Sequence, residues 1–290
     1  QIHPLGSIRY VATCTPEFHA RHFARGVNAQ SLAQAPVLVF NRKDDLQARH
    51  ARRLAGSEQA QEWGRLANEN PPRLRTHDRY GHRIDEVEFH PAWHELMRTA
   101  VENGLAGAPW RQEPARPARH AHVRRAVGYL GWTQVEMGHG CPTTMTYAVV
   151  PALRRAPELA ARYEPGLTAT AYEFGLVDPA GKRGLIAGMG MTEKQGGSDV
   201  RANTTRAVAQ PDGTYRLTGH KWFTSNGIAA DFFIVMTRVV EADHDPASGP
   251  GQMAQLIVPT DTPGVNIVRG VGIWGRPTSD HVEVRYENVR

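Results

Sequence analysis

The sequence has little cysteine, little lysine and no long apolar run. Its two cysteines, Cys14 and Cys141, cannot form the disulfide framework of a small secreted domain, so they favour a reducing, cytoplasmic location. No stretch reaches the roughly 18 consecutive apolar residues of a membrane-spanning helix, and the first residues lack the basic and apolar layout of a signal peptide. These absences predict a cytoplasmic protein with no membrane partner.

The basic excess is carried almost entirely by arginine. Lysine and arginine number 34 against 29 acidic residues, a formal net charge of +5, and only four of the basic residues are lysines. The arginines are scattered along the chain, and the basic helical cluster around Arg124 has no interleaved aromatic residues. Both observations favour a solvated surface, while a nucleic-acid or phosphate-binding face stays open as the alternative.

Three regions follow one another along the chain. Residues 1–54 read as alternating short strands and helices, too few for a complete α/β domain. Residues 55–183 show helical periodicity, with helices expected to begin at Ser57 and at His90–Pro91. Residues 184–290 show short strands rich in Val, Ile, Thr and aromatics, separated by turn signals. The pattern predicts an α+β protein in which an N-terminal helical region is followed by an antiparallel β-barrel.

Two patterns that would indicate other chemistry each fail at one residue. Residues 188–190, Gly-Met-Gly, begin like a dinucleotide-binding fingerprint, but Glu193 stands where the third glycine is needed. His90 and His94 have the spacing of a metalloprotease zinc pair, but Pro91 stands where the glutamate belongs. Capping or packing roles are therefore favoured for the two histidines, and no metal site is predicted.

Residues 188–200 combine the features of a binding loop in the sequence Gly-Met-Gly-Met-Thr-Glu-Lys-Gln-Gly-Gly-Ser-Asp-Val. An apolar strand delivers Thr192 and Glu193 at its end, and two glycines then allow a tight loop with exposed amides. Further along, residues 219–227 (Gly-His-Lys-Trp-Phe-Thr-Ser-Asn-Gly) add aromatic rings and hydroxyls beside a second glycine turn. One segment offers polar donors and the other an aromatic wall, with two ordinary hairpin ends of a barrel as the alternative.

These two segments resemble the acyl-CoA dehydrogenase family, whose middle domain is a β-barrel that carries FAD. The resemblance implies that Thr192 binds the flavin pyrimidine edge and that Ser198 lies toward the pyrophosphate. It also implies that Phe223 replaces the usual Trp beside the isoalloxazine and that Ser225 replaces the usual Thr near flavin N5. The residues so implied to bind the cofactor are Met189, Gly190, Met191, Thr192, Glu193, Gly196, Gly197, Ser198, Phe223, Thr224 and Ser225.

Residues 55–225 are most similar to the AidB-like branch of that family, and residues 251–290 to its ordinary members. Four segments carry the closer resemblance: 64–72, 89–94, 141–146 and 191–199. Members of the branch are cytoplasmic FAD-containing tetramers, associated with the response to DNA alkylation, that also bind DNA. The resemblance therefore implies an acyl-CoA thioester or similar substrate and a homo-oligomer in the full family. As an alternative, it implies a DNA-associated protein with vestigial dehydrogenase activity.

Two departures accompany the resemblance. Residues 1–50 resemble instead the effector domain of a LysR-type regulator, which indicates a composite chain and leaves a regulator fragment open on these residues alone. The C-terminal helical bundle that follows the barrel in the family has no counterpart up to Arg290. Because that bundle supplies the glutamate that removes the substrate α-proton, no catalytic residue is carried over. The expectation is an FAD-binding but catalytically incomplete portion of the enzyme.

Overall fold

The computed structural model describes Ala20 and residues 57–111, 120–227, 229–243, 249–273, 277–279 and 281–290. The chain separates into two compact units, Gln1–Asp44 and Asp45–Arg290, and the elements below all belong to the second. The α/β pattern predicted for residues 1–54 lies outside the described residues, apart from Ala20.

The first two described helices begin where the sequence predicts. Helix α4 (Glu58–Glu69) follows Ser57, whose hydroxyl accepts a backbone N–H of the first turn. Helix α5 (Pro91–Glu102) follows His90, whose ring nitrogen does the same, so this histidine caps a helix. Three further helices follow: α6 (Ala121–Trp132), α7 (Gly140–Leu153) and α8 (Pro157–Leu167). Short 3-10 turns are η1 (Ala108–Trp110), η2 (Pro179–Gly181) and η3 (Val200–Ala202).

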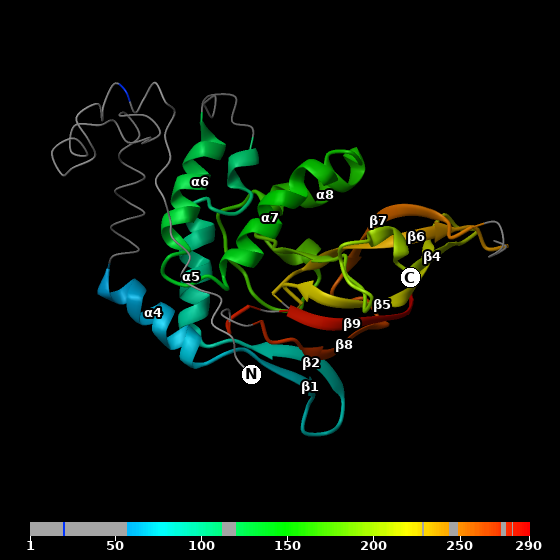
Figure 1. Ribbon diagram of the computed structural model, residues 1–290, viewed down its shortest axis with the longest axis horizontal. Helices are drawn as coiled ribbons and strands as arrows, with labels where there is room; N and C mark the ends of the chain where they lie inside the picture. Colours follow the sequence, from blue (N-terminus) through cyan, green and yellow to red (C-terminus); the bar gives the residue numbers. More distant parts are fainter. Residues whose placement is uncertain are drawn as a thin grey trace. The chain divides into compact units, whose positions relative to one another are not determined.

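A hairpin that the sequence did not predict interrupts the helical region. Strands β1 (Arg73–His77) and β2 (Arg83–Glu88) pair antiparallel and run beside strand β8 (Val265–Gly270; Figure 1). Two side chains attach the hairpin to that strand. Asp85 Oδ2 accepts the N–H of Ile267 at 3.0 Å, and Arg83 donates to the carbonyl of Ile267 at 2.6 Å. The hairpin therefore covers part of the free edge of β8.

The remaining strands form one sheet of seven strands among the described residues. They are β3 (Ala187–Gly190), β4 (Arg206–Ala209), β5 (Tyr215–Ser225), β6 (Phe232–Val240), β7 (Gln252–Pro259), β8 (Val265–Gly270) and β9 (His281–Val289). The α+β class is confirmed. The antiparallel barrel is not, because β6 pairs in parallel with both β3 and β4, which makes the sheet mixed.

Strands β3 and β4 share one position in the sheet. Strand β3 pairs with the first half of β6 and β4 with its second half, and β7 lies along the opposite edge of β6. Both also pair antiparallel with β5, so the two short strands lie end to end between β5 and β6. The intervening residues 191–205 leave the sheet and return to it. The predicted binding loop therefore connects two short strands that occupy the same position in the sheet.

Helices and sheet share a core. Trp93, Leu96 and Met97 of α5 belong to the same cluster of buried side chains as Val284 and Tyr286 of β9. A second cluster joins α7 and α8 to β3 and β6. Each fully buried large apolar side chain contributes about 1.5–3 kcal/mol to stability, so these clusters hold the helices firmly on the sheet. The helices α5 to α8 lie beside the strands in Figure 1.

Candidate functional site

The structure brings the two predicted binding segments side by side. Met189 of β3 pairs with Ser225 of β5, and the backbone N–H of Trp222 donates to the carbonyl of Thr192 at 2.9 Å. Thr192 therefore lies next to the Phe223–Ser225 segment. Segments separated by some thirty residues meet here because β3 and β5 are neighbours in the sheet.

A bulge in β5 turns the ring of Phe223 outward. The register between β5 and β9 shifts between Lys221 and Thr224, which places Phe223 in a left-handed backbone conformation with φ of +51°. Phe223 is 45% exposed, whereas Thr224 and Ser225 are buried. A large exposed aromatic face beside a serine hydroxyl is a surface on which a planar heterocycle can lie.

The loop tip is open, and the hydroxyl of Thr192 lies at its base. Gly196 has φ of +115°, and a Cβ there would meet no atom within 4 Å. A Cβ at Gly197 would lie 2.8 Å from Thr192 Oγ1, so only glycine leaves the space beside that hydroxyl free. Ser198 is exposed on the same tip. An exposed glycine loop, an open hydroxyl and an adjacent exposed ring fit the polar edge and the flat face of a flavin.

Glu193, one of the predicted cofactor residues, is engaged by other residues of the protein. It is 4% exposed, and its carboxylate accepts hydrogen bonds from Lys221, Thr204 and Thr205. Burial by itself raises the pKa of Glu193, but these hydrogen bonds outweigh it and lower the pKa to about 2. The carboxylate is therefore ionised and fully engaged within the protein.

Three residues that the sequence did not single out complete this base of the loop. Asn203 donates to the carbonyl of Met191 at 2.8 Å, and Arg238 donates to the carbonyl of Asn203 at 3.2 Å. Lys221, in the middle of strand β5, is fully buried. A lysine at an inward-facing strand position is itself a sequence signal, since buried lysine requires a partner.

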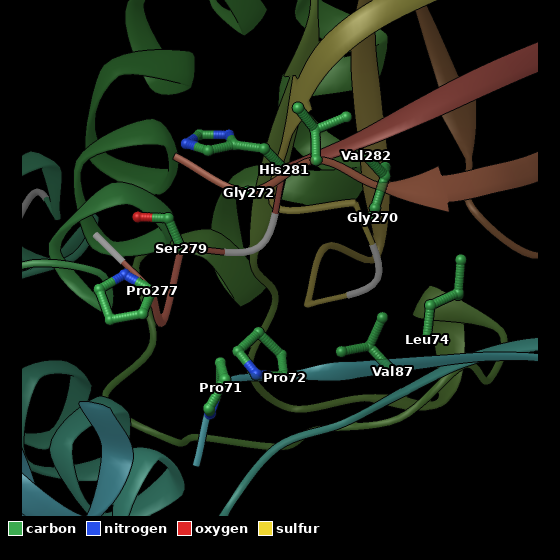
Figure 2. A pocket seen from close by; sticks show the side chains of 11 residues that line it. Pro71, Pro72, Leu74, Val87, Gly270, Gly272, Pro277, Ser279, His281 and Val282 are labelled. Atoms are coloured by element: carbon green, nitrogen blue, oxygen red, sulfur yellow. The ribbon is translucent and has the colours of Figure 1, made fainter. Parts of the chain in front are cut away.

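A pocket of about 250 Å³ is lined by residues of the β1–β2 hairpin, of β8, of β9 and of the segments next to them. His281 of the pocket wall pairs with Ser225. Figure 2 shows Leu74 and Val87 of the hairpin on one side of it and Gly270 and Val282 on the other. None of the eleven predicted cofactor residues lines this pocket.

The remaining histidine motif has a packing role. His94 Nδ1 lies 2.8 Å from the hydroxyl of Tyr172, and its ring packs edge-on against Phe174. Burial lowers the pKa of His94, which keeps it neutral at physiological pH. Within the described ranges, no group of three His, Cys, Asp or Glu residues could hold a metal ion. Likewise, none of the described helices is long and apolar enough to cross a membrane.

The sequence belongs to a known family along most of its length. The profile of the adaptive response protein AidB N-terminal domain matches residues 27–174, about half of the chain, and that of the acyl-CoA dehydrogenase middle domain matches residues 188–289. The chain therefore belongs to the acyl-CoA dehydrogenase family. Within it, the chain carries the AidB type of N-terminal domain. Neither match supports the LysR-type resemblance of residues 1–50, and the first already includes residues 27–50.

Individual relatives agree with this assignment. AidB of Escherichia coli (strain K12) is 48% identical over 171 residues, which are 59% of this chain and 31% of AidB. ACDH-11 of Caenorhabditis elegans, solved in complex with C11-CoA, has a TM-score of 0.65 at 23% identity over 88% of this chain and 47% of that one. A glutaryl-CoA dehydrogenase of Mycobacterium smegmatis, solved with FADH2, has a TM-score of 0.60 at 18% identity over 87% and 54%. These two structures establish the fold alone, and the chain spans about a third of AidB.

Proposed function

We propose that this chain binds FAD at the Thr192 and Phe223–Ser225 segments, as part of an acyl-CoA dehydrogenase-type oxidoreductase whose substrate is an acyl-CoA thioester. The observation that carries the proposal is the junction of β3 with β5, which places an open loop and an exposed ring next to each other. The complexes of family members with FADH2 and C11-CoA support the choice of cofactor and substrate class.

Each residue of the site would have a distinct task. The Thr192 hydroxyl would donate to the polar edge of the isoalloxazine, and the tip amides with Ser198 would bind the pyrophosphate side. The ring of Phe223 would cover one face of the flavin, and the Ser225 hydroxyl would approach the reactive edge. FAD, when bound, supplies the hydride acceptor of this reaction class.

The two carboxylates near the site are poor candidates for the base that removes the substrate α-proton. Glu193 is ionised but buried, with all its donors inside the protein. Asp199 caps the turn η3 by accepting the N–H of Arg201 at 3.1 Å, and it belongs to the loop that would hold the cofactor. A base on that loop would lie on the cofactor side of the substrate, while hydride and proton leave from opposite faces. We infer that the chain alone is catalytically incomplete.

The proposal is tested by titrating the apo chain with FAD and following flavin fluorescence and visible absorption. We expect saturable binding that Phe223→Leu weakens by about tenfold, equivalent to about 1.4 kcal/mol of lost stacking. Tyr215→Leu is the matched control, because Tyr215 is a comparably exposed aromatic on the same strand, far from the loop. Equal affinities for the two variants, or no saturable binding by the wild type, would contradict the proposal.

DNA association, the alternative that the resemblance implies, is favoured by no arrangement of the described residues. The exposed arginines of β1, Arg73 and Arg75, face Glu88 and Glu86 across the hairpin, so this surface is locally balanced in charge. A two-stranded surface with alternating signs attracts phosphate weakly. We therefore do not propose DNA binding for this chain.

A further inference from the structure

The carboxylate of Glu193 gathers five hydrogen bonds from two other segments of the chain. Oε2 accepts the backbone N–H and the hydroxyl of Thr204 at 2.8 and 2.9 Å, and Oε1 accepts those of Thr205 at 3.0 and 2.7 Å. The fifth donor is Lys221 Nζ, 2.9 Å from Oε1. A buried carboxylate with this many donors is in its most favourable setting inside a protein.

The four threonine contacts close the binding loop at its base. Glu193 follows β3, and Thr204 and Thr205 precede β4, so the carboxylate joins the two ends of the loop. The exposed tip, from Lys194 to Asp199, lies beyond this closure. The loop therefore has a fixed base and an open tip.

The lysine joins the loop to the second binding segment. Lys221 lies on β5, two positions before Phe223, and is fully buried. Its ammonium donates to the carboxylate of Glu193 and also to the carbonyl of Met191, at 3.3 Å. Because one partner lies on the loop and the other lies next to the bulge, the ion pair fixes the distance between Thr192 and the exposed ring.

We propose that Glu193 and Lys221 are a positioning pair for the cofactor site, which hold the loop and the bulge of β5 in register and do not contact the cofactor themselves. The inference rests on the proposed function for the identity of the ligand, FAD. The geometric part, closure of the loop by the pair, stands independently of it. Glu193 would thus position the loop, whereas its neighbours in the motif, such as Thr192 and Ser198, would contact the cofactor.

The test compares Lys221→Met with Lys182→Met. Lys182 also forms a buried ion pair, with Asp231 at 2.5 Å, but it lies outside the loop and the bulge, so it controls for the general cost of losing a buried pair. Two quantities are measured for each variant: the rate of tryptic cleavage after Lys194, identified by mass spectrometry of the fragments, and the dissociation constant for FAD. Urea unfolding curves are recorded for both variants, so that the two quantities can be compared under conditions in which the variants have the same folded fraction.

We expect Lys221→Met to raise both the cleavage rate and the dissociation constant by about tenfold or more, and Lys182→Met to change neither at equal folded fraction. Equal effects of the two variants on both quantities would overturn the proposal and leave an ordinary core ion pair. Faster cleavage by Lys221→Met, in a protein whose wild type does not bind FAD, would support the closure and refute only the cofactor assignment.

A second variant keeps the test decisive if Lys221→Met does not fold. In Glu193→Gln combined with Lys221→Met, the amide oxygen can still accept from one of the two threonines, and no buried charge is left without a partner. We expect the loop of this double variant to be cleaved more slowly than the loop of Glu193→Gln alone. We also expect the double variant to bind FAD with an altered visible spectrum of the flavin. If the double variant matches the wild type in spectrum and affinity, the ion pair has no positioning role.

Discussion

At the residue scale, the shape of the candidate site depends on small and buried residues more than on reactive side chains. Gly197 has no side chain to fill the space beside the Thr192 hydroxyl. Lys221 supports the segment from which Phe223 projects. The side chains that would contact a ligand, Thr192 and Phe223, are therefore arranged by neighbours that would not. Such positioning groups matter because misplacement of a site by a fraction of an ångström weakens binding.

Replacement of Gly197 by alanine should lower FAD affinity with little effect on folding. A Cβ there would lie 2.8 Å from Thr192 Oγ1, so the hydroxyl must rotate or the loop must shift, while the tip itself is exposed. We expect about a tenfold increase in the dissociation constant, measured by flavin fluorescence. Gly181→Ala is the control, since a Cβ at Gly181 meets no atom within 4 Å. Unchanged affinity in Gly197→Ala would argue against Thr192 as a ligand.

A buried carboxylate in the helical region should give the protein an acid-sensitive fold. Glu136 accepts the backbone N–H groups of Gly138 and His139 at 2.5 and 2.9 Å, and also the hydroxyl of Thr278 from the β8–β9 connection. Burial alone raises the pKa of Glu136, but the hydrogen bond and charge of His139 and the Thr278 hydroxyl lower it to about 2. The group thus joins the helices to the sheet in its ionised form.

The sign of the pH effect follows from that lowered pKa. The contribution of Glu136 is fully present above its ordinary pKa of 4.5 and is lost as the pH falls toward 2, by at most about 3 kcal/mol. Glu136→Gln should therefore be less stable than the wild type at neutral pH, with a smaller loss on acidification. Urea unfolding at neutral pH and across that acid interval measures both. A parallel decline of the two proteins would show that the ionised form contributes nothing.

At the scale of elements, the sequence predicted local structure well and non-local pairing poorly. The helix starts at Ser57 and His90 were predictable because the capping residues and the apolar spacing agree. The mixed sheet was not, since turn signals identify hairpins and say nothing about strands that pair from a distance. One signal was available: the first five residues of β6, 232–236, are a continuous apolar run, which is typical of a strand with parallel partners and two covered faces.

The hairpin β1–β2 and the base of the loop escaped prediction for a related reason. The hairpin strands carry Arg, His and Glu on their exposed faces, so alternation is hidden by long polar side chains. The binding motif itself was predicted from its residue types and family resemblance, and the structure brings its two segments together. The engagement of Glu193 by Thr204 and Thr205 could not be predicted, because it depends on where β4 returns to the sheet.

The attachment of the hairpin to β8 yields a prediction at this scale. Asp85 has φ of +46° and accepts the N–H of Ile267, so Asp85→Ala removes the acceptor and leaves a strained backbone position. We expect a loss of about 1–3 kcal/mol in the free energy of unfolding by urea. Asp85→Asn is the control, because asparagine tolerates this backbone conformation and keeps an oxygen acceptor. If both variants lose the same amount, the hydrogen bond to β8 is not what the aspartate contributes.

At the scale of the whole molecule, the division of the chain into units and the extent of the family match set different boundaries for the N-terminal part. The chain divides after Asp44 into two compact units, yet the AidB-type match begins at residue 27. Among the described residues, the clusters of buried side chains that join α4–α8 to the sheet extend from Ala60 to Val289. The described helices and strands therefore share an extensive apolar core among themselves.

Removal of residues 1–50 should accordingly leave the unfolding midpoint of the remainder nearly unchanged. The apolar contacts that the described residues of α5, α7 and the sheet make with one another are retained in the shortened chain. Urea unfolding of the two forms, followed by tryptophan fluorescence, makes the comparison. A large loss of stability in the shortened form would show that residues 27–50 are an integral part of the helical domain, as the extent of the family match indicates.

We expect the chain, when loaded with FAD, not to dehydrogenate acyl-CoA thioesters by itself, because the step requires a carboxylate at the substrate α-carbon on the face opposite the flavin. Of the nearby acids, Glu193 is occupied by five hydrogen bonds and Asp199 lies on the cofactor loop. Loss of a general base costs about 10²–10⁴ in rate.

Anaerobic mixing of the loaded chain with acyl-CoA thioesters of different chain length, followed through the visible absorption of the flavin, provides the measurement. Slow or absent bleaching is expected, and Asp199→Asn should behave like the wild type. Rapid bleaching by any thioester would show that a base exists within this chain. Bleaching that appears only after addition of the separately expressed remainder of an AidB-type relative would place the base in that remainder, and it would make the chain one half of a two-part active site.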